Sequence, residues 1–314
     1  MSKTHVVIGT RRSKLALAQT EMVSEMLRQA HPGLTVEHKH ITTKGDVVLD
    51  RPLSAIGDKG LFVTEIEDAM RRGEVDLAVH SAKDLPSELP PDMALGAFPA
   101  REDARDALVS RGGLTLSQLP EGATVGTSSL RRASQLRHWR PDLQIADLRG
   151  NVDTRLRKLH EGAYDAIVLA AAGLHRLGLA GEISEYLAPT VMVPAVSQGI
   201  LGIEARAGDD EVLALLAALD DHAARTAALA ERAFLARFGG GCQVPLAAYA
   251  QLGGDHIQIY GLIGSASGHV VRGSRRGPAS DPVSLGRHLA EELLSIGGQT
   301  LLTMQKLSSP GAAR

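Results

Sequence analysis

"ATVGTSSLRRASQLRHW", residues 123–139, joins a short apolar stretch to a longer amphipathic one through a polar turn. The first part predicts a strand near 123–126, and the last part predicts a helix near 129–139. Ser129 stands where that helix would begin, either as an ordinary N-cap or as part of a binding site, and the sequence leaves both open. A strand that passes through a polar turn into a helix is the repeating unit of α/β proteins.

The same alternation continues in both directions along the chain. Further strands are expected near 5–9, 35–41, 75–79, 93–98, 107–110, 143–148, 166–170 and 200–205. Further helices are expected near 13–30, 61–72, 152–161 and 171–178. A second pattern begins near residue 210, with helices at 210–218 and 222–238, strands at 246–252, 256–263 and 268–275, and a helix at 282–296.

These patterns predict an α/β fold with two doubly wound α/β domains around a cleft, as in periplasmic binding proteins, and a smaller C-terminal α+β domain. We expect residues 1–99 with 200–217 in domain 1, 100–199 in domain 2 and 218–314 in domain 3. The strand near 200–205 would then return to the first sheet. Residues 42–60 exceed the usual length of a connection, so we interpret them as a lid.

The composition is that of an ordinary globular protein: 44% of the 314 residues are hydrophobic and 22% are charged. Aromatic residues make up only 3%, which argues against a stacking surface for single-stranded nucleic acid. The start of the chain, residues 1–17, has no apolar run as long as a signal peptide's core, because Arg11, Arg12 and Lys14 interrupt it. No run in the sequence approaches the ~20 apolar residues that span a bilayer. We therefore expect a cytoplasmic protein without a nucleic-acid or membrane partner, and, lacking any sign of a large apolar interface, a monomer.

Charge is unevenly spread along the chain. The formal net charge is −2, yet residues 128–160 hold eight arginines and lysines against three aspartates. A local basic patch in a mildly acidic protein indicates a specific anionic ligand rather than bulk attraction to a polyanion.

Four polar clusters follow predicted strands: "TRRS" at 10–13, "HSAKD" at 80–84, "GTSSLRR" at 126–132 and "LRGNVDTR" at 148–155. Ligands of open α/β sheets bind outside the carboxyl ends of the strands. Helix N-termini at the same positions offer unpaired N–H groups to an anion. The clusters together therefore predict an anion-binding site.

Single residues in these clusters have simpler explanations. Asp84 either forms the turn before Pro86 or faces a cation within an otherwise anionic ligand. His80 is more often a core or supporting histidine than a ligand, and His38 and His40 lack further spaced ligands for a metal site. We predict no metal.

The single cysteine, Cys242, lies in "GGGCQVP" and excludes an intrachain disulfide. A lone cysteine is usually a small buried hydrophobe. The three glycines before it would let the backbone and a ligand approach closely, which favours a reactive thiol.

Nine motifs together resemble the porphobilinogen deaminase (hydroxymethylbilane synthase) family, in family order from about residue 6 to 250: "IGTRRSKLALAQ", "TTKGD", "GDKGLF", "DLAVHSAKDLP", "REDARDAL", "VGTSSLRR", "LRGNVDTRL", "AIVLAAAGLHRLG" and "GGGCQVPLAAYA". The chain departs from the family at "PAVSQG", where Ser197 replaces an expected glycine. If that position needs a positive φ, serine is strained there.

The resemblance implies a transferase that joins four porphobilinogen molecules, each losing ammonia, on a covalent dipyrromethane cofactor, and then releases hydroxymethylbilane. It implies that Cys242 carries the cofactor through a thioether. Asp84 would be the catalytic carboxylate, and Arg11, Arg149 and Arg176 would bind the substrate. The remaining residues would hold the cofactor: Lys83, Ser13, Thr127, Ser129, Arg131, Arg132 and Arg155.

A different class of protein stays open at this point. A two-lobed anion-binding or effector-sensing protein without catalysis would carry similar strand-end clusters, although it would give Cys242 no task. A nucleic-acid binder is less consistent with the acidic remainder of the chain and its few aromatic residues.

Overall fold

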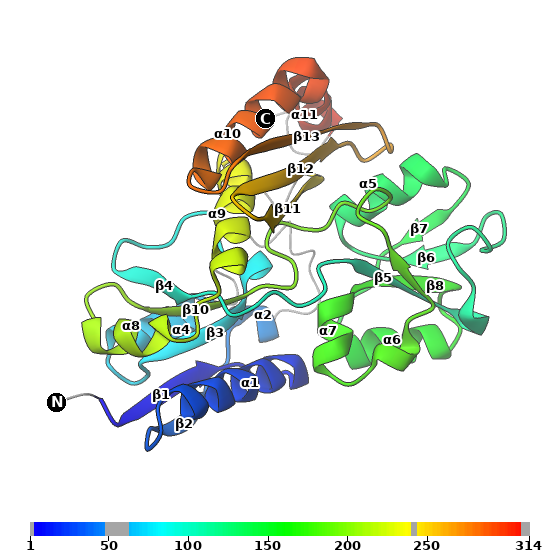
Figure 1. The fold of residues 1–314 in the computed structure, drawn as a ribbon. Coiled ribbons are helices and arrows are strands. Elements are labelled where there is room, and N and C mark those ends of the chain that lie inside the picture. Colours follow the sequence, from blue (N-terminus) through cyan, green and yellow to red (C-terminus); the bar gives the residue numbers. More distant parts are fainter. Residues whose placement is uncertain (1–2, 48–62, 240–243, 309–314) are drawn as a thin grey trace. The chain divides into compact units, whose positions relative to one another are not determined.

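The computed structural model describes residues 3–47, 63–239 and 244–308 (Figure 1). The chain divides into two compact units, one of Met1–Glu102 with Gly199–Arg225 and the other of Asp103–Gln198 with Thr226–Arg314. Among the described residues, no helix is both long and apolar enough to cross a membrane.

The first unit is built on a five-stranded sheet in the order β2-β1-β3-β10-β4. The first three of these are parallel to one another, whereas β10 runs antiparallel to both of its neighbours. The strands are β1 (His5–Thr10), β2 (Thr35–His40), β3 (Leu77–Ser81), β4 (Met93–Ala97) and β10 (Leu201–Arg206).

Helices α1 (Lys14–Ala30) and α8 (Asp210–Ala217) pack on one face of this sheet, and α4 (Thr64–Arg71) packs on the other. The short helix α2 (Lys44–Val47) follows β2. Val6 and Ile8 of β1 pack in one core cluster with Leu27 of α1. Val7, between them, packs in the other cluster with Met70 of α4. This alternation along one strand produces a sheet buried on both sides, as in doubly wound folds.

The second unit contains a sheet of the same plan, in the order β7-β6-β8-β5-β9. Its strands are β5 (Asp106–Ser110), β6 (Thr124–Gly126), β7 (Gln144–Ala146), β8 (Ala166–Ala170) and β9 (Glu185–Leu187). Three helices follow the parallel strands: α5 (Leu130–Trp139), α6 (Val152–His160) and α7 (Ala171–Arg176). In the first sheet β2 and β3 lie on opposite sides of β1, and in this sheet β7 and β8 lie on opposite sides of β6. The strand order therefore reverses between β1 and β3 in one sheet and between β6 and β8 in the other.

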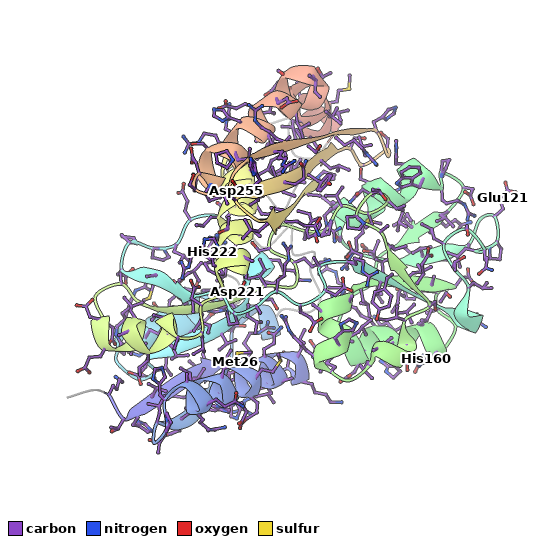
Figure 2. All side chains as sticks on the ribbon, viewed as in Figure 1. Met26, Glu121, His160, Asp221, His222 and Asp255 are labelled. Atoms are coloured by element: carbon purple, nitrogen blue, oxygen red, sulfur yellow. The ribbon has the colours of Figure 1, made fainter. Side chains whose placement is uncertain are left out.

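A smaller antiparallel sheet follows, in the order β11-β12-β13, from β11 (Leu246–Gly253), β12 (His256–Gly264) and β13 (Val270–Pro278). Its helices are α9 (His222–Ala236), α10 (Pro282–Leu293) and α11 (Gln299–Ser308). Asp221 and His222, labelled in Figure 2, mark the start of α9, and the Asp221 carboxylate accepts a hydrogen bond from the Ala224 N–H at 2.7 Å. Gly286 allows α9 and α10 to pack closely, because a Cβ there would lie 2.0 Å from the carbonyl oxygen of Ala230.

The expected fold class is confirmed, and the strand near 200–205 does return to the first sheet as β10. The expected three-domain division stays a prediction. Two-thirds of the proposed lid, residues 48–60, lie outside the described residues, whereas 44–47 form the short helix α2, which the sequence did not indicate. Strand β9 and helix α11 were also missed.

Ser197 is the one described non-glycine residue with a positive φ, at 59°. The strain expected from the missing glycine is therefore present, since an L side chain rarely adopts this conformation. The Ser197 N–H donates to the buried carboxylate of Glu231, which holds the strained turn in place.

Candidate active site

The strand ends of the first unit surround a cavity of about 80 Å³. It lies at the point where the strand order reverses between β1 and β3, the position at which open α/β sheets bind ligands. Its polar lining consists of Arg11, Ser13, Gln19, His80, Ser81 and Asp84. Three of these six were expected from the sequence as site residues, and the structure brings those three together.

Asp84 ends a single 3-10 turn, Ala82–Asp84, directly after β3. Buried neighbours fix this turn, because Ala82 and Leu85 are 1% and 5% exposed and the Ala82 N–H donates to the Ile200 carbonyl at 2.9 Å. The Asp84 side chain itself is exposed. A rigid turn thus presents a carboxylate at the cavity, with the half-buried Lys83 beside it.

Ser13 caps helix α1, since its hydroxyl accepts the Ala16 N–H at 3.3 Å. Ser13 is therefore the N-cap of this helix. Gln19, one turn further along α1, donates to the Ser81 hydroxyl at 2.9 Å and so links α1 to the end of β3. Neither Gln19 nor Ser81 was singled out from the sequence, because their contact joins residues far apart in the chain.

A larger hollow of about 910 Å³ lies elsewhere in the first unit. Its arginines are neutralised by neighbouring carboxylates: Arg71 lies 2.6 Å from Asp92, and Arg206 pairs with Asp209. It therefore offers no surplus positive charge to an anion, and its size does not make it the better candidate.

In the second unit, the loop after β6 is organised by its own side chains. The Thr127 hydroxyl accepts the Ser129 N–H at 3.2 Å, and the Ser129 hydroxyl caps α5 by accepting the Arg132 N–H at 3.4 Å. Ser128 bonds both backbone groups of Leu148, at 2.9 and 3.1 Å, and so joins this loop to the one after β7. The two strand-end clusters of this unit therefore lie together.

Arg131 and Arg132 surround one carboxylate, that of Asp106 at the start of β5. Its two oxygens accept from Arg131 at 2.6 and 3.1 Å and from the Nε of Arg132 at 2.9 Å, and Gln198 donates to it at 3.1 Å. The arginines are each 6% exposed and Asp106 is fully buried. Sequence reasoning missed Asp106, because only the fold brings it to helix α5.

This cluster leaves one buried positive charge in excess. Burial by itself would raise the pKa of Asp106, but the charges of Arg131 and Arg132 hold it well below its usual range. Burial also lowers the pKa of Arg132. Two guanidinium groups against one carboxylate favour a further anion beside them, since a buried charge is costly without a counter-ion.

Arg149 and Arg155 are half-buried on the loop after β7 and the first turn of α6. The Arg155 Nε donates to the Gly150 carbonyl at 2.7 Å. Gly150 has a φ of 113°, and a Cβ there would lie 2.8 Å from Thr154, so only glycine fits this turn. Arg176, also half-buried, ends α7.

Cys242 lies outside the described residues. Within the described part of the chain, no group of three histidine, aspartate or glutamate side chains could hold a metal ion.

Comparison with known proteins decides the family. Residues 6–214 match the family model "Porphobilinogen deaminase, dipyromethane cofactor binding domain", and residues 225–295 match "Porphobilinogen deaminase, C-terminal domain". The chain belongs to the porphobilinogen deaminase family.

Relatives within the porphobilinogen deaminase family match nearly end to end. A porphobilinogen deaminase of Roseiflexus sp. (strain RS-1) is 68% identical over 300 residues, which cover 96% of this chain and 99% of the relative. That of Syntrophotalea carbinolica is 52% identical over 303 residues, 96% of each chain.

Solved structures with a similar course of the chain include the ligand-binding component of an ABC-type import system from Staphylococcus aureus with zinc bound. It is 11% identical with a TM-score of 0.40, and the match covers 74% of this chain and 73% of that one. The Bordetella pertussis BvgS periplasmic domain is 17% identical with a TM-score of 0.39, covering 69% of this chain and 40% of that one.

Proposed function

We propose that this chain is a hydroxymethylbilane synthase, which joins four porphobilinogen molecules head to tail with release of ammonia and then frees the linear tetrapyrrole by hydrolysis. The observation that carries the proposal is the near end-to-end likeness to relatives named porphobilinogen deaminase. The cavity that contains Asp84 and Arg11 supports it, because the reaction needs a carboxylate beside an anion-binding group.

The proposed cofactor is a dipyrromethane attached to Cys242 through a thioether. When bound, it supplies the covalent primer to which each substrate is added. The buried excess charge at Arg131 and Arg132 fits such a group, because each pyrrole carries an acetate and a propionate. Lys83, Ser13, Thr127, Ser129 and Arg155 complete the set that we propose to hold it.

Arg11, Arg149 and Arg176 are proposed to bind the carboxylates of the incoming porphobilinogen. Arginine suits this task because its planar guanidinium can donate two parallel hydrogen bonds to one carboxylate. Arg11 and Arg149 lie in the loops after β1 and β7, and Arg176 ends helix α7, which follows β8.

Asp84 is proposed to act on the substrate's own charge. Loss of ammonia from the aminomethyl group leaves a cation, and a carboxylate nearby favours that change. Opposite unit charges ~4 Å apart attract by roughly 4 kcal/mol at an effective dielectric constant of 20. An effect of that size changes a rate by about a thousandfold.

The test is to give the purified full chain porphobilinogen and to measure its consumption together with released ammonia. Both should proceed in a fixed one-to-one ratio. Binding of porphobilinogen without any ammonia would instead support the alternative, a non-catalytic anion-binding or effector-sensing protein.

We also propose that the protein is a monomer and lies in the cytoplasm. Sedimentation of the purified chain at the mass of one copy is the expected result for the first, and fractionation of cells with an antibody to the chain tests the second.

A further inference from the structure

His80 lines the cavity that also contains Asp84, and one of its ring nitrogens contacts a buried glutamate. Its Nε2 lies 3.0 Å from the Oε2 of Glu204, which enters from the neighbouring strand β10. The histidine is 8% exposed and the glutamate is fully buried. No task in the proposed reaction has so far used either residue.

Glu204 has an unusual environment for a carboxylate. Its second oxygen, Oε1, is buried and makes no hydrogen bond in the part of the chain that the structure describes. Burial raises the pKa of the neighbouring Glu67 on α4, the charge of Glu204 raises it further, and Arg71, 3.5 Å from Glu67, opposes this rise. A buried carboxylate held by a single partner is costly to the fold, which favours a functional reason for keeping it.

The contact with Glu204 occupies one ring nitrogen of His80, Nε2, and leaves the other, Nδ1, for a ligand. A distance of 3.0 Å is typical of an N–H donating to oxygen and longer than the usual O–H donation. In a neutral imidazole whose Nε2–H points at Glu204, the lone pair is on Nδ1. No hydrogen bond joins Nδ1 to another described residue, and His80 is among the residues that line the cavity.

We propose that His80 is a substrate-binding residue whose Nδ1 accepts a hydrogen bond from the ammonium of the substrate's aminomethyl group, and that Glu204 is the positioning residue that fixes its tautomer. This proposal rests on the proposed function and adds to it the recognition of the amine. Asp84 and His80 would then accept hydrogen bonds from the ammonium, and Arg11 would donate to a carboxylate.

The hydrogen-bonding groups of the ligand agree with this assignment. An ammonium has three N–H donors, and acceptors at Asp84 and His80 would take up two of them.

The first test is spectroscopic and uses the full-length, ¹⁵N-labelled protein. A ring ¹H–¹⁵N correlation spectrum should show His80 as the Nε2–H tautomer, with its signals assigned by their loss in the double variant His80→Phe/Glu204→Leu. In Glu204→Leu alone, His80 should lose that fixed tautomer. A proton on Nδ1 of His80 in the unaltered protein would overturn the proposal, whatever the enzyme's activity.

The second test compares two ligands. The double variant replaces a buried pair by apolar side chains, a change that folded proteins often tolerate. Its KM for porphobilinogen should rise roughly tenfold to hundredfold, the effect of one hydrogen bond to a charged group. The inhibition constant of the analogue with hydrogen in place of the aminomethyl group should stay within about twofold.

Equal losses for both ligands would show that the pair only supports the fold, and no loss for either would show that the amine does not meet His80. Either result rejects the inference while leaving the proposed function intact. If the unaltered chain does not consume porphobilinogen, the proposed function fails, and the spectroscopic test still reports on the tautomer.

Discussion

Two aspartates at strand ends, Asp84 and Asp106, show how surroundings decide what one type of side chain can do. Asp84 is exposed on a turn held by buried neighbours, so its carboxylate can meet a ligand. Asp106 is fully buried between Arg131 and Arg132, so it can only hold those side chains in place. We therefore expect a substitution at Asp84 to slow the reaction and a substitution at Asp106 to destabilise the fold.

Asp84→Asn should reduce turnover by at least about a hundredfold, because the amide can neither balance a full cation nor serve as a base. Substrate binding should persist, since the arginines are unchanged. Single-turnover measurements on cofactor-loaded protein check this, with Asp84→Glu as the control that keeps the charge and should fall in between. Turnover of the Asn variant within fivefold of the unaltered enzyme would leave Asp84 as a turn residue.

Asp106→Asn should lower the free energy of unfolding by about 3–5 kcal/mol at neutral pH, the usual cost of removing one partner from a buried ion cluster. Asp142→Asn is the matched control, because Asp142 pairs with Arg140 near the surface, where an ion pair contributes little to stability. Urea denaturation of both variants measures the difference. Equal effects of the two substitutions would contradict the buried cluster.

The contribution of the Asp106 carboxylate to the free energy of unfolding should also depend on pH. Its folded-state pKa is depressed, so its stabilisation is present above the unfolded pKa of about 3.9 and is lost as the pH falls toward the folded value. Repeating the urea series from pH 7 to pH 3 should therefore show the gap between the unaltered chain and Asp106→Asn narrowing in acid. If this difference in the free energy of unfolding grew as the pH fell, the pKa of Asp106 would not be depressed in the folded protein.

At the scale of elements, the sequence predicted most strands and helices because each long one carries a clear period. For Ser129 the sequence left an N-cap and a binding role both open, and the structure shows that it caps α5. Strand β9 was missed because three residues cannot show an alternation. The burial of Arg131 and Arg132 was missed for a different reason. Their partner Asp106 is 25 and 26 residues away, and only the sheet order brings it beneath α5.

The loop after β7 and the start of α6 carry a prediction at the same scale. Arg149→Leu and Arg155→Leu should each impair the reaction and leave folding largely intact, because both arginines are half-buried at strand-end positions. Losing a hydrogen bond to a charged group costs about 1.5–3 kcal/mol, or roughly tenfold to hundredfold in kcat/KM. Arg157→Leu is the control, since Arg157 pairs with Glu161 on the exposed face of α6. Unaltered kinetics in either test variant would remove that arginine from the site.

At the scale of the whole chain, two sheets of one plan each place basic residues and helix starts at their strand ends. That arrangement alone indicates an anion-binding protein and does not distinguish a binder from an enzyme. The distinction depends on Cys242 and on the family to which the chain belongs. The covalent cofactor is therefore the central claim.

The intact mass of the purified chain tests that claim most directly. The unaltered protein should be heavier than its sequence by the mass of two linked pyrroles, and Cys242→Ser should fold but have the mass of its sequence alone. The same added mass in the Cys242→Ser variant, or none in the unaltered protein after incubation with porphobilinogen, would contradict the account.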